Sequence, residues 1–130
     1  MKKYLALCLA ALALNVYASG NHSANNDPAR ASARHARQQW QTKLNSLPIG
    51  ASEAELTQWL QQNNLLQHGE KPDFSNKRYI NANLPNGHFP VKPQANQFNP
   101  CDSWFVLLDI QLDEQCRVAK KEARALGSCI

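Results

Sequence analysis

Three cysteines in the second half of the chain are the residues best suited to covalent chemistry. They are Cys101, Cys116 and Cys129. Two thiols can form a disulfide, and a thiol beside a base can act as a nucleophile. No histidine lies near Cys116 in the sequence, and its only adjacent cation is Arg117. We therefore predict no catalytic role for Cys116 and expect a free surface thiol or one that pairs between molecules.

The histidines show no spacing typical of a metal site. The four of them stand far apart, at His22, His35, His68 and His88. Short ligand spacings of the kind that bind zinc do not occur among them or with the cysteines. The sequence also lacks a glycine-rich phosphate loop and a nucleophile elbow. It therefore predicts no catalytic residues, no metal site and no cofactor.

The start of the chain has the pattern of a secretory signal peptide. Two lysines come first, followed by an apolar run from Leu5 to Leu14. This run is shorter than the roughly 20 residues that span a bilayer. It is followed by small residues at the −3 and −1 positions, which is the pattern that signal peptidase recognises. We expect a Sec-type signal peptide over 1–18, cleaved between Ala18 and Ser19. The mature protein would be a periplasmic or secreted bacterial protein without a transmembrane segment.

Removal of the signal peptide leaves one domain and little net charge. Residues 19–27 are predicted to form a disordered polar leader, and residues 28–130 suffice for a single domain. Cleavage removes two lysines, so the number of Lys and Arg falls from 14 to 12, against 10 Asp and Glu. The net charge of the mature chain is therefore about +2. Nucleic-acid binding needs a concentrated basic face, so we expect no nucleic-acid partner.

Two amphipathic helices are predicted at the start of this domain. Asp27 is a good N-cap and Pro28 suits the first turn of a helix that continues to about Asn45. Ser52 begins a second helix with Glu55 three residues later, which is a capping box. The apolar residues at helical spacing are Ala29, Ala33, Ala36, Trp40, Leu44, Leu47, Leu56, Trp59 and Leu60.

Strands are predicted after the helices. Alternation of apolar and polar residues favours an edge strand over Arg78–Leu84 and a central strand over Ser103–Leu112. Pro85 to Pro100 lacks periodicity and is expected to be a long loop. Residues 117–126 have high helix propensity, but the neighbouring turn and strand favour β pairing. The fold class is therefore α+β, with two N-terminal helices packed on a small antiparallel sheet of about three strands.

The last two strands are expected to form a hairpin that brings two cysteines together. Pairing Leu112 with Arg117 across the turn places Asp109 opposite Lys120.

The same register places Cys101 opposite Ser128, one position from Cys129. Disulfides need Cα atoms about 4.4 to 6.8 Å apart, which this alignment supplies. We predict a Cys101–Cys129 disulfide, with Cys116 left as the free thiol.

The helix pair and the hairpin resemble a group of small bacterial envelope domains. The segments concerned are LPIGASEAELTQWL at the second helix and LDIQLDEQCRV in the hairpin. In that group a turn with glycine, here Gly50, precedes a capped helix, here at Ser52. Over residues 40–126 the chain is similar to outer-membrane assembly lipoproteins of the small-protein-A type and to the β-lactamase-inhibitor-protein-like fold. The resemblance implies an α+β domain of the cell envelope.

These observations favour a noncatalytic periplasmic module that binds another envelope protein. The residues expected to contact a partner are Phe89, Val91 and Phe98 in the long loop and Arg30, Arg34 and Arg37 on the first helix. The aromatic residues could instead fill the core, and the arginines could instead form a solvated face or attract anionic lipid. Two other functions stay open: an inhibitor or immunity protein against an envelope-targeting hydrolase, and a small enzyme that uses a cysteine or histidine.

Overall fold

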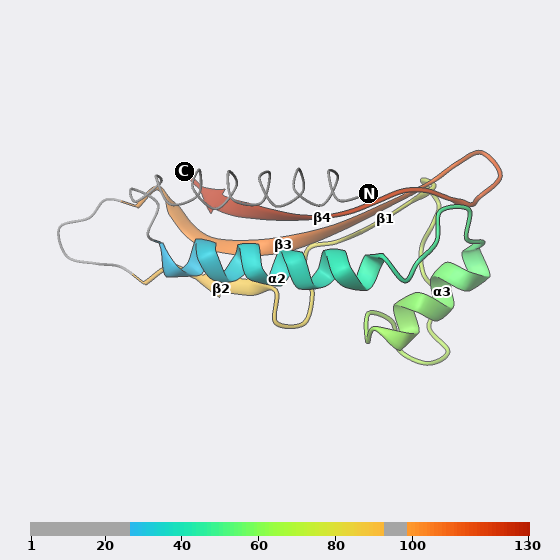
Figure 1. The fold of residues 1–130 in the computed structure, drawn as a ribbon, viewed down its shortest axis with the longest axis horizontal. Coiled ribbons are helices and arrows are strands. Elements are labelled where there is room, and N and C mark those ends of the chain that lie inside the picture. Colours follow the sequence, from blue (N-terminus) through green and yellow to red (C-terminus); the bar gives the residue numbers. More distant parts are fainter. Residues whose placement is uncertain (1–26, 93–98) are drawn as a thin grey trace, which may run out of the picture.

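A long helix lies along one face of an antiparallel sheet (Figure 1). The computed structural model describes residues 27–92 and 99–130. In chain order, the elements are α2 (Pro28–Leu44), α3 (Glu53–Gln62), β1 (Arg78–Asn81), β2 (His88–Pro90), β3 (Cys101–Leu112) and β4 (Val118–Cys129). The α+β class is confirmed. The predicted signal peptide, its cleavage site at Ala18 and Ser19, the leader up to Asn26, and Phe98 lie outside the described residues.

The two helices begin where their capping residues predict, but they lie in mid-chain rather than at the N-terminus. The Asp27 carboxylate accepts a hydrogen bond from the Ala29 N–H at 3.0 Å. Ser52 Oγ accepts one from the Glu55 N–H at 3.2 Å, and it donates to the Glu55 carboxylate. Both caps satisfy backbone donors that the first helical turn leaves free. They therefore determine where α2 and α3 start.

The sheet is organised around β3, as the sequence predicts. β4 pairs along nearly all of β3 on one side, while β1 and β2 share the other side. The sheet has four strands where about three are predicted. The additional strand is β2, which lies inside the segment predicted to be a loop. This strand has only three residues and ends at Pro90. It is too short to show periodicity and depends on pairing with β3.

The predicted hairpin pairing was wrong by two residues. Asp109 lies opposite Glu122, not Lys120, and Leu112 lies opposite Val118. The turn is one residue longer than predicted, since the Asp113 N–H donates to the Arg117 carbonyl and Cys116 has a positive φ of 61°. The second residue of the difference comes from an irregularity between the Leu112 and Gln111 pairs, where β4 contains one additional residue. Residues 117–126 are nevertheless a strand from residue 118 onward, as favoured.

The core lies between α2 and the sheet and is closed at one end by α3. All nine apolar helix residues predicted to face it are buried. Seven of them, all except Ala29 and Ala33, form one core cluster with the alternate β3 residues Val106, Leu108 and Ile110, each fully buried. In Figure 1, α3 lies beyond the C-terminal end of α2 rather than beside it. The Trp59 indole N–H donates to Ser46 Oγ at 2.9 Å, which fixes this arrangement.

The Cys101–Cys129 disulfide is confirmed, and it closes the open end of the hairpin. The two cysteines lie directly opposite each other in the β3–β4 register. Gly127 sits beside this bond and beneath the Trp104 ring. A Cβ atom at Gly127 would lie 2.8 Å from Cys129 Sγ and 3.1 Å from the Trp104 ring. Glycine is therefore required here for packing.

Replacing Gly127 with alanine should destabilise the oxidised protein. The added methyl group has no space between the disulfide and the Trp104 ring, and such overpacking costs roughly 1–3 kcal/mol. Urea unfolding of Gly127→Ala and of the adjacent, exposed Ser128→Ala measures the effect. Ser128→Ala should change the free energy of unfolding by less than about 0.5 kcal/mol. Equal stability of the two variants would contradict the proposed role of Gly127.

Candidate functional site

The three arginines predicted to contact a partner lie on one side of α2, beside the free edge of β4. Arg34 and Arg37 are exposed and Arg30 is half-buried. Their spacing of four and then three residues keeps them in one stripe. No Asp or Glu occurs in α2, so the helix itself does not neutralise the stripe.

Side chains of α2 reach the outer edge of β4 at Ala123. The Arg37 Nε–H donates to the Ala123 carbonyl at 3.1 Å, and the Ala123 N–H donates to Gln41 Oε1 at the same distance. The peptide groups of Ala123 therefore point away from β3. Two residues of α2 supply the hydrogen bonds that a further strand would otherwise make there.

A second group of contacts ties the start of α2 to the end of the hairpin. The Trp104 indole N–H donates to the Asp27 carboxylate at 3.2 Å. The Arg30 guanidinium lies 5.0 Å from the centre of the Trp104 ring, a cation–π contact. Trp104 itself pairs with Gly127 across the hairpin. The arginine stripe is thus held at both of its ends, through Arg37 and through Arg30.

Between these two groups of contacts, the described residues leave the edge of β4 open. Peptide groups of alternate residues in an antiparallel strand point to opposite sides. Because the pairing is regular from residue 120 to 128, Ala125 and Gly127 point outward like Ala123. Within residues 27–92 and 99–130, no hydrogen bond from another element reaches their outward N–H or C=O groups. We call Ala125, Gly127 and the three flanking arginines the β4 edge surface.

The aromatic and aliphatic residues predicted to anchor a partner lie elsewhere. Phe89 stands opposite Trp104 in the sheet and packs against the core. Val91 is half-buried, and its N–H donates to the Asp102 carbonyl at 2.9 Å. The structure brings the arginines together with the sheet edge, but it does not bring these residues to the same surface.

A network of ion pairs occupies the sheet face opposite α2. The Asp109 carboxylate, only 3% exposed, accepts hydrogen bonds from Arg78 at 2.9 and 2.7 Å. Arg124 lies 3.3 Å from the same carboxylate and 3.1 Å from Glu122. The hydrogen bonds from Arg78 lower the pKa of Asp109 below its ordinary value, although desolvation acts in the opposite direction. This network stabilises the charged form of a buried carboxylate.

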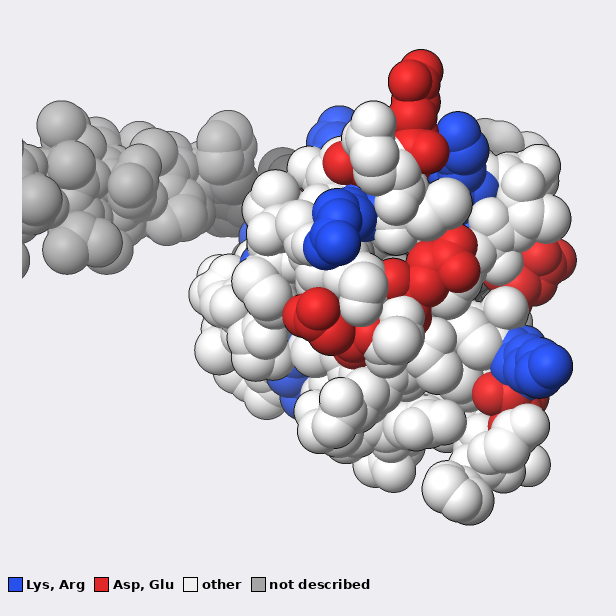
Figure 2. All heavy atoms as spheres, turned by 90° about the vertical axis from the view of Figure 1, so that its right-hand side faces the viewer, with Lys and Arg blue, Asp and Glu red and all other residues white. Residues whose placement is uncertain are grey.

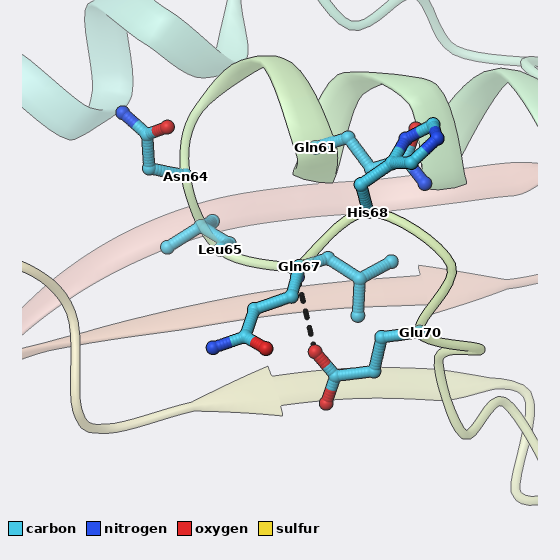
Figure 3. Close-up of a pocket in the computed structure, with 7 residues that line it drawn as sticks. Gln61, Asn64, Leu65, Gln67, His68 and Glu70 are labelled. Atoms are coloured by element: carbon cyan, nitrogen blue, oxygen red, sulfur yellow. Dashed lines mark hydrogen bonds between the residues drawn. The ribbon is translucent and has the colours of Figure 1, made fainter.

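Two further features, a surface hollow and the free thiol, lie away from the β4 edge surface. A shallow hollow of about 670 Å³ follows α3, where Gln61, Asn64 and His68 line its wall and Glu70 accepts a hydrogen bond from the Gln67 N–H (Figure 3). Cys116 is half-buried in the β3–β4 turn and lies outside the disulfide. Neither feature brings a base and a nucleophile together. In the part of the chain that the structure describes, no three His, Cys, Asp or Glu side chains gather as a metal site.

The end of the molecule formed by α3 and the β3–β4 turn differs in charge from α2. Figure 2 shows this end, where acidic and basic side chains are interspersed over a mostly uncharged surface. The first turn of α3 contributes Glu53 and Glu55. The unneutralised basic stripe on α2 is therefore a local feature and does not extend over the whole molecule.

No protein-family model, curated protein sequence or solved structure matches this chain. No helix within residues 27–92 and 99–130 is long and apolar enough to cross a membrane. Sequence reasoning singled out the arginines as candidates and did not single out Gln41, Ala125 or Gly127. Ala125 and Gly127 could have been identified because they lie two and four positions after Ala123, so their peptide groups point to the same side of the strand.

Replacing Asp109 with asparagine should remove part of the acid sensitivity of folding. A carboxylate whose folded pKa is lowered contributes stability above its unfolded pKa of about 3.9, and this contribution is lost as pH falls through the folded pKa. Below pH of about 4, the unfolding free energy of the native protein should therefore fall more steeply than that of Asp109→Asn. Urea unfolding at a series of pH values from about 2 to 7, a range that includes the reference pKa of Asp, measures this pH dependence. The matched change Asp102→Asn, at an exposed carboxylate outside the network, should keep the native slope; parallel curves for Asp109→Asn would contradict the assignment.

Proposed function

We propose that this protein is a noncatalytic accessory module of the cell envelope that binds another protein through the β4 edge surface. The observation that carries the proposal is the open pair of outward residues, Ala125 and Gly127, beside an exposed arginine stripe. Free N–H and C=O groups at a sheet edge can accept an extended segment as an added strand. Side chains beside such an edge select which segment binds.

The surrounding contacts support binding because they hold the surface in one shape. Arg37 and Gln41 fix α2 against Ala123, while Trp104 and Asp27 fix its other end. The disulfide joins β3 and β4 next to Gly127. A partner therefore orders few additional groups on binding, which lowers the entropic cost of association.

An envelope location follows in this proposal from the predicted signal peptide, and the Cys101–Cys129 disulfide is compatible with an oxidising compartment. Intact-mass measurement on protein recovered from the periplasm of an expressing bacterium checks it. The mature chain should begin at Ser19 and carry one internal disulfide. Recovery of a chain that still begins at Met1, or of protein only in the cytoplasm, would contradict the location.

Site-specific photo-cross-linking in living cells tests the binding surface. A photoreactive residue at Ser128, which is exposed on β4, should give one dominant adduct with another protein. The same residue at Glu53, exposed at the opposite end of the molecule, should give none. Absence of an adduct at Ser128, or equal adducts at both positions, would reject the β4 edge surface. The mass of the partner distinguishes an assembly protein from a hydrolase, and capture of a hydrolase would indicate an inhibitor.

A further inference from the structure

We propose that the β4 edge surface takes an acidic, extended segment of its partner as an added β-strand, with Arg34 as the main charge contact. This inference rests on the proposed function and adds the chemistry of the partner.

The open part of the edge is short, because it begins after Ala123 and β4 ends at Cys129. Ala123 is already capped by α2 on one side. At the start of β4, Val118 exchanges hydrogen bonds with Gly50 and Ala51 at 2.7 and 2.9 Å. A partner strand can therefore pair at Ala125 and Gly127, where it would gain up to four backbone hydrogen bonds. The peptide groups of Ala123, already bonded to α2, determine where along β4 the added strand can begin.

The charges beside this opening are unpaired within the described residues. The ion pairs of the described residues involve Arg78 and Arg124 on the opposite face of the sheet, and the three arginines of α2 take part in none. Lys121, a cation of β4, donates to the carbonyls of Leu44 and Leu47. Arg30 and Arg37 each have a contact with the protein, as described above. Arg34 is exposed and lies between them, so it is best placed to bind a carboxylate from outside.

The spacing of the arginines matches a strand with acidic residues at alternate positions. Arg30 and Arg34 are four residues apart, which is about 6 Å along a helix at 1.5 Å per residue. Side chains on one face of a strand recur at about 6.6 Å. Carboxylates at positions i and i+2 of the partner can thus meet two arginines at once. Such pairs form charge-assisted, often bidentate hydrogen bonds.

Two other occupants of this edge are less well matched. Antiparallel pairing of β4 with a second copy at Ala125 and Gly127 would bring the arginine stripes of the two copies close together, and like charges near one another are destabilising. An anionic membrane would meet the arginines, but the apolar face of α2 is buried in the core and cannot insert. The acidic strand uses both the open peptide groups and the charges.

Fluorescence anisotropy with a labelled nine-residue peptide of alternating Glu and Val tests the inference on the disulfide-bonded protein. The peptide should bind, and a peptide with Lys in place of Glu should not. Arg34→Glu should weaken binding at least tenfold, which corresponds to about 1.4 kcal/mol. The matched charge change Lys71→Glu, at an exposed residue between α3 and β1, should stay within about twofold of the native protein.

N-methylation of the peptide distinguishes an added strand from charge attraction alone. One peptide carries methyl groups on its odd-numbered amides and a second carries them on its even-numbered amides, and these are the two phases. One phase should abolish binding and the other should preserve it, since only alternate N–H groups face β4. Absence of binding to the native protein, equal binding of the Lys peptide, or equal loss in both phases would overturn the inference. Loss of binding to anionic lipid vesicles in Arg34→Glu, without peptide binding, would overturn it in favour of a membrane contact. If the Ser128 adduct still forms when the peptide does not bind, the acidic strand fails while the proposed function stands.

Discussion

The pairing of β3 with β4 is the constraint on which the other contacts depend. β3 pairs with all three other strands, so its alignment decides which side chains face α2 and which face the opposite side. The actual register differs from the simple hairpin prediction by two residues. An even shift preserves the face of every side chain, so Val106, Leu108 and Ile110 reach the core in either alignment. A shift of one residue would have turned Ala123 of β4 away from the core and Arg124 toward it.

Two irregularities in this hairpin have opposite effects and together align the disulfide. The one near Leu112 places an additional residue in β4. The one after Cys101 places an additional residue in β3, so Cys101 faces Cys129 although the intervening residues follow another register. The disulfide then holds the strand ends beside Gly127, where Trp104 packs and contacts Arg30. The position of the arginine stripe over the edge therefore follows from the hairpin alignment.

Sequence patterns predicted the parts of this structure that arise from local periodicity. The buried face of α2, its N-cap at Asp27 and the central strand were found because apolar spacing and capping chemistry act within a few residues. β2 was missed because three residues carry no period. Gln41 was missed because its contact with Ala123 joins residues 82 positions apart. The pairing of Arg78 with Asp109 joins residues 31 positions apart, and no local pattern signals it.

An open sheet edge is a hazard for a small protein, because it can pair with any other exposed strand. In this molecule most of that hazard is removed by other parts of the chain. The loop at Gly50 covers Val118, and α2 covers Ala123. The part left open is bordered by arginines that no carboxylate of the described residues neutralises. These charges disfavour a second copy of the same basic edge and favour a segment of opposite charge. The features that prevent indiscriminate strand pairing are thus the same features that would select a partner.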